Sequence, residues 1–514
     1  MNRFAACKNG VTTLKMNNLH VMGSMIPLLL LFLAACQPQA FSPPRLATAT
    51  LISEKATPES QEPLFLAAPT ATADTIQRNE AELSSNEVLN VWVNETSPEH
   101  QAVLQSMMED FTQQSGVNVA IRLVSPRLLP DLMHTAVLSD TLPDVVLHPL
   151  EYTVTWSEEG ILDPQAATSI IDEIGRDSFD QAALDLASAN GQPSAIPSDG
   201  FHQIWLYRTD WTKQQGLDIP DNYEGMMDNA EAFFDPENII SGIVIPTESN
   251  LITTHRAFEH LATANGCQMI DNKGEVHLLD NTCREALDFY FSIVNQFSPT
   301  GVQTDTSARN AFLEGRTAMI MTSPDILPDL AEAAPLDQNT GILTTLTGRG
   351  ANSNPANFGN ISFLGITTAA DPDVASAFAK YWFGDGYANW LAVEPERKVP
   401  MYLGTNEDPG LFIDQWGQTP VIEGKSLADI FGEETVNLLK ENVADTERWG
   451  FKQGQGALVG KLYESLTFSV VLQEMLSGYF DSTQTIQEAA ERVIELIPNY
   501  QFAIEPTPMP VPTS

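Results

Sequence analysis

The sequence predicts an α/β fold with a parallel sheet, because strand-like and helix-like stretches alternate over residues 88–148. The strand-like stretches are VLNVWV at 88–93, VNVAIRLV at 117–124 and PDVVLH at 143–148, each a short apolar run. Helix-like stretches at 97–116 and 130–138 lie between them. This order is typical of a parallel sheet, which binds its ligands at the carboxyl ends of the strands.

The stretch 97–116 carries the clearest helical pattern. Its apolar residues recur three and four positions apart, and Gly116 ends the pattern. Ser97 is a suitable helix cap, with Pro98 at the first helical position. The apolar residues are Val103, Leu104, Met107, Met108 and Phe111.

Residues 1–35 have the composition of an export signal. Three basic residues and no acid precede an apolar run of about a dozen residues, too short to span a bilayer. The next residues, LAAC at 33–36, resemble the lipobox of bacterial lipoproteins, in which Cys36 would be the lipidated first residue of the mature chain. An ordinary signal peptide with an accidental cysteine is the alternative. No other apolar run reaches 18 residues, so lipid on Cys36 is the expected membrane attachment.

The composition limits the possible partners and the size of the fold. The chain of 514 residues has 26 basic and 67 acidic residues, a net charge of −41, which argues against binding nucleic acid. A hydrophobic content of 43% over this length allows two or more lobes with large cores.

The cysteines predict one disulfide. Cys7 would leave with the signal and Cys36 would carry lipid, so Cys267 and Cys283 remain as a pair in an oxidising compartment. The turn sequence DNKG at 271–274, followed by the strand-like EVHLL, could bring the two thiols together. A bridge closing about 15 residues would stabilise the fold by roughly 3 kcal/mol.

Two segments are expected to lack a packed fold. Residues 36–87 are rich in Pro, Ala, Thr, Ser and Glu, and predict a flexible tether that carries the lipid anchor. The tail 501–514 is likewise expected to be disordered.

Between 88 and 500, ordered segments resemble the bacterial extracellular solute-binding proteins of the sugar-binding type (family 1) that serve ABC importers. The resemblance rests on the order of the segments, not on any one motif. They are the opening strand–helix–strand at 91–121, LPDVVLHPLEYTVTWSEEGILDP at 142–164, GQPSAIPSDGFHQIWLYRTDW and the residues after it at 191–226, AFLEGRTAMIMTSP at 311–324, and NISFLGITTAADPDVASAFAKYWF at 360–383.

The resemblance implies a periplasmic-binding-protein fold of type II, with two α/β lobes joined by hinge strands and a ligand cleft between them. One lobe would comprise 88–197 and 359–420, and the other 198–358 and 421–500. The ligand would stabilise hinge closure by contacting both lobes.

A sugar cleft needs polar side chains for the hydroxyl groups and aromatic rings for the apolar faces of the sugar. Asn94 and Glu95 follow the first strand and are candidates, although they could equally form a helix entry. His148, Glu151 and Tyr152 follow the third strand, in the loop that carries ring and carboxylate contacts to sugar in the family.

The lobe crossings and the second lobe supply further candidates. Asp199 and Phe201 would lie at the first crossing, where the Ser-Asp-Gly sequence is also suited to a simple hinge turn. Glu248 and Ser249 match a polar cleft segment of the second lobe.

The second crossing would place Phe358 and Asn360 at the cleft, and Tyr402 is a similar candidate. Two features depart from the family. Asp325, not tryptophan, follows Pro324, and NFGN at 357–360 replaces a Gly-Gly-Trp pattern. The ligand is therefore expected to be smaller or more polar than an oligosaccharide, or not a sugar.

The predicted function is a lipid-anchored solute-binding protein on the extracytoplasmic side of the cell membrane. It would capture a small solute, expected to be a carbohydrate, and deliver it to the transmembrane subunits of an ABC permease. It is expected to be a monomer without cofactor or metal. The alternative is a ligand-sensing or non-transport lipoprotein of the same fold. Motifs typical of serine hydrolases, zinc proteases and nucleotide-binding proteins are missing from the sequence, which argues against an enzyme.

Overall fold

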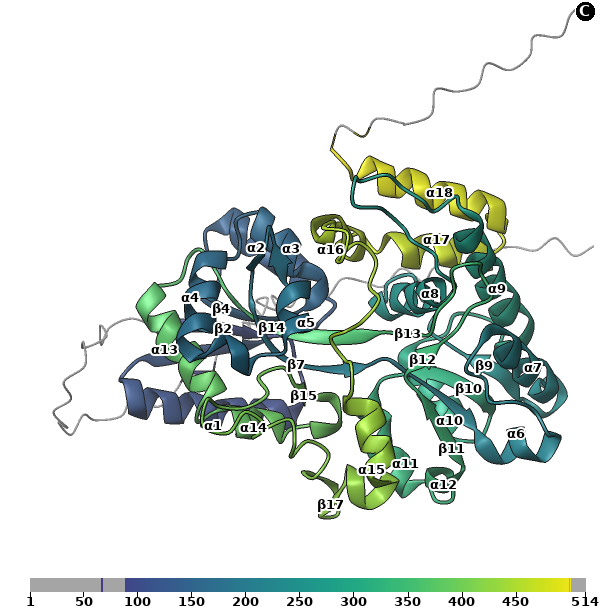
Figure 1. Ribbon diagram of the computed structural model, residues 1–514, viewed down its shortest axis with the longest axis horizontal. Helices are drawn as coiled ribbons and strands as arrows, with labels where there is room; N and C mark the ends of the chain where they lie inside the picture. Colours follow the sequence, from purple (N-terminus) through teal and green to yellow (C-terminus); the bar gives the residue numbers. More distant parts are fainter. Residues whose placement is uncertain (1–65, 68–87, 499, 501–514) are drawn as a thin grey trace, which may run out of the picture. The chain divides into compact units, whose positions relative to one another are not determined.

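The computed structural model describes residues 66–67, 88–498 and 500. In these ranges the chain forms two α/β lobes, each built around its own sheet (Figure 1). The predicted signal 1–35, the predicted lipid anchor Cys36 and the predicted tail 501–514 lie outside the described residues. So does the predicted tether 36–87, apart from Leu66–Ala67, which pairs with a strand of the first sheet.

The first sheet has seven strands in the order β1-β3-β2-β4-β14-β7-β15. Strand β2 runs parallel to β3 and β4, which confirms the predicted arrangement of the first three strands. Strand β14 is antiparallel to β4 and β7, so the complete sheet is mixed. The strands are β1 (Leu66–Ala67), β2 (Val88–Val93), β3 (Asn118–Leu123), β4 (Val145–Pro149), β7 (Ile196–His202), β14 (Gly359–Ile366) and β15 (Val399–Pro400).

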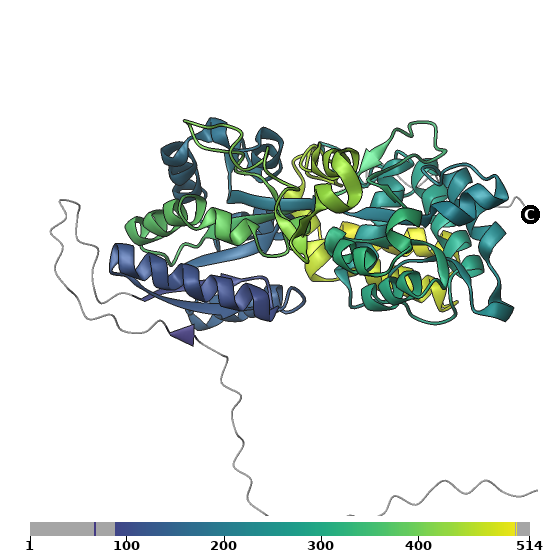
Figure 2. The ribbon, with the colours of Figure 1, turned by 90° about the horizontal axis from the view of Figure 1, so that it is seen from below.

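Helix α1 (Pro98–Ser115) confirms the pattern read from the sequence. The Ser97 side chain accepts a hydrogen bond from the backbone N–H of His100 at 3.2 Å, and Gly116 ends the helix at φ 77°. Figure 2 shows α1 beside α13 (Pro372–Phe383), where the rings of Phe111 and Phe378 meet edge to face at 5.3 Å. The apolar spacing of α1 therefore packs the core of this lobe.

The second sheet has four strands in the order β11-β8-β10-β9. Helices of the same lobe pack against it, α7, α9 and α10 among them (Figure 1). The strands are β8 (Ile204–Arg208), β9 (Ser241–Val244), β10 (Thr317–Thr322) and β11 (Thr340–Leu343), and the helices of this lobe include α7 (Tyr223–Phe233), α8 (Ile252–Ala264), α9 (Asn281–Phe297) and α10 (Asp305–Leu313).

The chain crosses between the sheets at two adjacent places. Gln203 separates β7 from β8, and Phe358 separates β13 (Ala356–Asn357) from β14. The backbone N–H of Gln203 donates to the carbonyl oxygen of Phe358 at 2.8 Å, so the two crossings are paired. A Cβ at position 359 would lie 1.8 Å from the carbonyl oxygen of Val443. Only glycine therefore fits at the start of β14, where the backbone of Val443 passes close by.

The C-terminal helices contact both lobes. The hydroxyl group of Thr155, on α3 (Leu150–Glu158), donates to the carbonyl oxygen of Ala457 on α16 (Gly456–Glu464) at 2.9 Å. Farther along, Ser469 on α17 (Thr467–Leu476) donates to the carbonyl oxygen of Leu251 at 2.6 Å, and α18 (Ser482–Glu495) packs on α9 and α17.

The predicted disulfide is confirmed. Cys267 and Cys283 are joined, with their Cα atoms 4.6 Å apart. The turn at 271–274 forms, since Asp271 Oδ1 accepts hydrogen bonds from the backbone N–H groups of Lys273 and Glu275. The expected strand EVHLL is reduced to a single bridge between Ile270 and Val276.

No helix of the described part of the chain is long and apolar enough to cross a membrane. The remaining elements complete the two lobes and their connections. They are α2 (Leu129–Ser139), α4 (Pro164–Ile174), α5 (Gln181–Leu186), α6 (Thr209–Gln215), α11 (Leu327–Glu332), α12 (Leu336–Asn339), α14 (Tyr387–Leu391), α15 (Leu427–Lys440), β5 (Ser188–Ala189), β6 (Gln192–Pro193), β12 (Thr345–Leu346), β16 (Pro420–Ile422), β17 (Lys425–Ser426), and 3-10 turns at Arg176–Ser178, Pro236–Asn238, Pro324–Ile326 and Pro395–Arg397.

Candidate functional site

A cavity of about 590 Å³ is lined by segments from both lobes and from the C-terminal helices. The first lobe contributes 125–131, which follows β3 and enters α2. The second lobe contributes 250–256 at the start of α8, and 321–325 where β10 ends. The cavity therefore lies at the carboxyl ends of strands from both sheets, where α/β folds place their ligands.

Two buried amide groups face this cavity without hydrogen-bond partners in the described part of the chain. Asn360, on β14, is only 7% exposed, and its Oδ1 is buried and unpaired. The Oδ1 of Asn250, before α8, is also buried and unpaired. A buried polar atom without a partner destabilises a fold by about 1–3 kcal/mol, so each unpaired amide in a cavity indicates a place for a ligand group.

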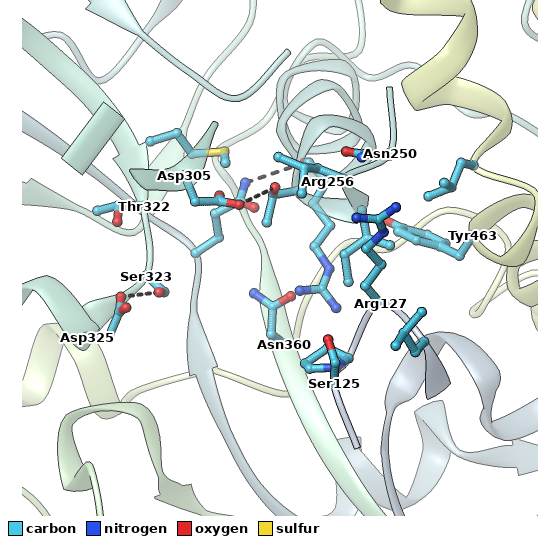
Figure 3. Close-up of a pocket in the computed structure, with 18 of the residues that line it drawn as sticks. Ser125, Arg127, Asn250, Arg256, Asp305, Thr322, Ser323, Asp325, Asn360 and Tyr463 are labelled. Carbon is cyan, nitrogen blue, oxygen red and sulfur yellow. Dashed lines mark hydrogen bonds between the residues drawn. The ribbon is translucent and has the colours of Figure 1, made fainter. Parts of the chain in front are cut away.

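Four arginines line the cavity and differ in how they are paired. Figure 3 labels two of them, Arg127 and Arg256. Arg309 forms ion pairs with Asp325 at 3.0 Å and Asp329 at 2.6 Å. Arg397 pairs with Glu394 at 3.1 Å, and its guanidinium lies 5.2 Å from the ring centre of Phe201.

The other two arginines come from opposite lobes. Arg256, on α8, donates from Nε to Glu151 Oε1 at 3.0 Å. Arg127, in the loop before α2, is exposed and makes neither an ion pair nor a side-chain hydrogen bond with any residue that the structure describes. Arg127 is therefore the arginine of the cavity lining that is free to bind an anion.

The acidic groups of the cavity already have partners, with one exception. Asp305 accepts a hydrogen bond from Thr253 at 2.9 Å, and burial raises the pKa of its carboxyl group despite this bond. Asp325 accepts from Ser323, and Glu464 accepts from the indole N–H of Trp156 at 3.0 Å. Asp131 is the exception, since within the described ranges it has no ion pair.

A group of paired charges adjoins the cavity and shares Arg256 and Tyr463 with its lining. We call it the interlobe network: Glu151, Arg256, Glu259, Arg448 and Tyr463. Arg448 is fully buried and donates to Glu151 at 2.9 Å and to Glu259 at 3.0 Å. The Tyr463 hydroxyl donates to Glu259 Oε2 at 2.7 Å. Glu151 lies on α3 of the first lobe and Glu259 on α8 of the second, so the network links the lobes.

The arginines of the network set the charge of Glu151. Burial alone would raise the pKa of the Glu151 carboxyl group, but the guanidinium groups of Arg256 and Arg448 lower it to about 2. The two carboxylates in turn raise the pKa of Arg448, although burial opposes them. Glu151 and Arg448 are therefore held in their charged forms.

Three residues predicted for the site from the sequence line the cavity: Tyr152, Phe201 and Asn360. Glu151 lies behind it in the interlobe network. Phe358 lies there too, with its ring centre 4.1 Å from the Arg448 guanidinium. Ligand binding by these residues stays a prediction.

The structure places other predicted residues in the core of the first lobe. His148 is buried with its ring 5.1 Å from that of Trp156, and burial lowers its pKa to about 4. Asp199 accepts from the indole N–H of Trp390 at 2.7 Å. Tyr402 packs 5.0 Å from Phe179.

The remaining predicted residues lie outside the cavity lining. Glu95 is 4.0 Å from Arg397 and 3.9 Å from His100, and burial raises its pKa. Neighbouring Asn94 has a buried, unpaired Oδ1. Glu248 and Ser249 precede Asn250, and the Glu248 carbonyl accepts from Thr254 at 2.8 Å.

Sequence reasoning did not select Arg127, Arg256, Asp305 or Arg309. The rule that ligands bind after the carboxyl ends of strands could have selected Arg127, since β3 ends at Leu123. Arg256 and Arg309 are helix residues whose side chains reach the cavity only through the packing of the second lobe, so their sequence carried no signal.

Comparison with known proteins identifies the family. Residues 106–393, more than half of the chain, match the family described as bacterial extracellular solute-binding proteins. The chain belongs to this family. It is 24% identical over 418 residues to the putative ABC transporter periplasmic-binding protein YcjN of Escherichia coli (strain K12), and the match covers 78% of this chain and 90% of the relative.

Solved structures confirm the two-lobed periplasmic-binding fold. An ABC transporter solute-binding protein from Thermotoga lettingae with bound α-D-tagatose has a TM-score of 0.64 at 18% identity, covering 80% of this chain and 100% of the other. Maltose-bound MalE3 of T. maritima reaches 0.63 at 16%, with the same coverage. A ribitol complex from Agrobacterium radiobacter K84 reaches 0.58 at 16%, covering 80% and 99%. Family and fold are those of solute-binding proteins, not of enzymes.

Proposed function

We propose that this solute-binding protein captures a small hydroxylated solute, a sugar or polyol, in the cavity between its lobes and delivers it to an ABC permease. The observation that carries the proposal is the unpaired, buried amide of Asn360 in a cavity lined by both lobes. An amide offers both a donor and an acceptor, which suits the hydroxyl groups of a carbohydrate. The bound tagatose, maltose and ribitol of proteins with the same fold support this class of ligand.

The lining suits a compact ligand. Tyr152 and Phe201 supply aromatic rings from the first lobe, and Tyr463 supplies one from the C-terminal helices. Most of the other lining groups are polar or charged, and the volume of about 590 Å³ is within the range of small-molecule sites. A monosaccharide, a disaccharide or a polyol is the proposed size class.

We propose that a hinge between the lobes and a membrane anchor take part in delivering the solute to the permease. We place the hinge at the paired crossings of Gln203 and Phe358. Because β7 of the first sheet runs to His202, residues 198–202 of the predicted lobe II (198–358 plus 421–500) then join the predicted lobe I (88–197 plus 359–420). A solute that contacts both lobes favours the closed arrangement. Lipid on Cys36 would hold the protein at the membrane near its permease.

Thermal unfolding with a panel of sugars, polyols, sugar acids and peptides tests the binding proposal. A compound that binds only the folded protein raises its melting temperature, by the equivalent of about 2.7 kcal/mol at 100 times its dissociation constant. We expect at least one sugar, polyol or derivative to raise it. No change across the whole panel would contradict the proposal, and a rise with peptides alone would reassign the ligand class.

The anchor is tested separately. Expression of the wild type and Cys36→Ser in a bacterial host should place the wild type in the membrane fraction and move the variant to the soluble exported fraction. An unchanged membrane share for Cys36→Ser would overturn lipid anchoring without touching the binding proposal.

A further inference from the structure

Not every arginine of the cavity lining has an acidic partner. Arg309 and Arg397 have acidic partners close by, but Arg127 has none among the described residues. Asp131, four residues after Arg127 and also in the lining, forms no ion pair with it. A guanidinium that reaches into a cavity without a carboxylate is a ready binding group for an external anion.

Arg256 contributes a second guanidinium from the opposite lobe. Its Nε and Nη2 both lie within 3.0 Å of the same Glu151 oxygen, and Arg448 donates to that oxygen as well. One carboxylate oxygen therefore serves two guanidinium groups, and Arg256 Nη1 makes no hydrogen bond within the described ranges. Glu151 acts as a positioning residue that fixes Arg256 and leaves part of its donor set free.

The two side chains enter the cavity from opposite sides. In Figure 3, Arg256 extends down from α8, whereas Arg127 extends up from the other lobe, with Asn360 and Tyr463 also facing this region. The charge of Arg256 is shared with Glu151, whereas Arg127 has no acidic partner among the described residues. Closure around an anion would give each guanidinium a charge-assisted contact, one from each lobe.

From this arrangement, which rests on the proposed function, we infer the ligand class. The solute is a hydroxylated anion, a sugar or polyol that carries a carboxylate or a phosphate. Arg127 and Arg256 bind the anionic group, and the amide of Asn360 binds hydroxyl groups. The thin aromatic lining agrees with a ligand held more by charge and hydrogen bonds than by stacking.

Matched pairs of compounds test this inference on the purified protein. Glucose is compared with glucuronate, galactose with galacturonate, and glycerol with glycerol 3-phosphate, by thermal shift and then by calorimetric titration. We expect an acidic member to bind at least about tenfold more tightly than its neutral partner, and the pairs separate carboxylate from phosphate recognition. If a neutral member binds as tightly as its acid, the inference fails while the proposed function stands. If no sugar, polyol or derivative binds, the proposed function fails too.

A charge-removing variant assigns the effect to one residue. Arg127 is exposed and unpaired, so the Arg127→Gln variant should fold as the wild type does. It should bind the acid about ten- to hundredfold more weakly than the wild type does, and bind the neutral partner equally well. Arg176→Gln is the matched control, since Arg176 lies on the first lobe, outside the cavity, paired with Asp172. Unchanged affinity of Arg127→Gln for the acid would overturn the inference.

Discussion

The interlobe network and the cavity adjoin each other and share Arg256 and Tyr463. Both are rich in polar groups, but most groups of the network are paired, whereas several groups of the cavity are not. In the network, Arg448 donates to two carboxylates, to the Gly359 carbonyl at 3.1 Å and to the Tyr463 hydroxyl at 3.3 Å. In the cavity, the Asn360 amide and the Arg127 guanidinium have no partner in the described part of the chain.

This difference in pairing distinguishes groups that stabilise the fold from groups that are available to a ligand. Paired charges in the interior hold elements of both lobes together, and removing one partner exposes the other to an unfavourable environment. Unpaired groups in a cavity contribute little to folding and gain their partners from a ligand. Substitutions that break paired contacts of the network should therefore change stability, and substitutions of unpaired groups in the cavity lining should change affinity.

The largest effect is expected for Arg448→Met. This change leaves Glu151 and Glu259 buried without their shared cation and should lower the free energy of unfolding by about 3–5 kcal/mol. Urea unfolding followed by tryptophan fluorescence measures the loss. Arg316→Met is the control, because Arg316 is 45% exposed and should lose less than about 1 kcal/mol. Equal losses in the two variants would mean that the network does not hold the lobes together.

The next effect is a pH dependence assigned to Glu151. Its folded-state pKa of about 2 lies below the ordinary value of 4.5, so its charge stabilises the fold above about pH 4.5, and this contribution disappears as the pH falls towards 2. The contribution amounts to about 3 kcal/mol. We expect the stability difference between the wild type and Glu151→Gln to shrink steadily from pH 5 to pH 3 in urea titrations. A constant difference would contradict the assignment.

A smaller loss is expected for Tyr463→Phe. The change removes the hydroxyl that donates to Glu259 at 2.7 Å but keeps the ring, and should lower the free energy of unfolding by about 2 kcal/mol. Tyr479→Phe is the control, since Tyr479 is 74% exposed. A loss no greater than that of the control would show that this bond does not contribute to stability.

The smallest effect on stability is expected for Asn360→Ala. Because its buried Oδ1 is unpaired, its removal should not lower the free energy of unfolding, while affinity for the solute should fall about tenfold. Asn357→Ala is the matched control at the same crossing. Its amide donates to the Asn442 carbonyl at 2.6 Å, so it should lose about 1 kcal/mol of stability and no affinity. A loss of stability without a loss of affinity for Asn360→Ala would contradict the assignment of this amide to ligand binding.

The sequence predicted the fold class and the first elements, but few of the residues that line the cavity. Periodicity identified α1 and the first three strands, because these elements bury continuous apolar patterns that local sequence displays. The disulfide followed from the cysteine count. The mixed first sheet was not visible in the strands alone, since the antiparallel placement of β14 depends on a chain return far along the sequence.

The site depends on contacts between distant segments. Asn360 and Phe201 lie on crossing strands, which the family resemblance located in sequence. Asp199 and His148 looked equally suitable as polar residues near strand ends, yet each is buried against tryptophan. No local signal distinguishes a carboxylate that faces a cavity from one that faces a core, because the neighbour that decides it comes from another element.

Hydrogen exchange with and without the tightest-binding solute shows whether both lobes contact the solute. If the solute binds between the lobes, backbone amides of 125–131 in the first lobe and 250–256 in the second should both become more protected. Amides of α13, on the outer face of the first lobe, should stay unchanged. Protection confined to one lobe, or located away from both segments, would contradict a site shared between the lobes.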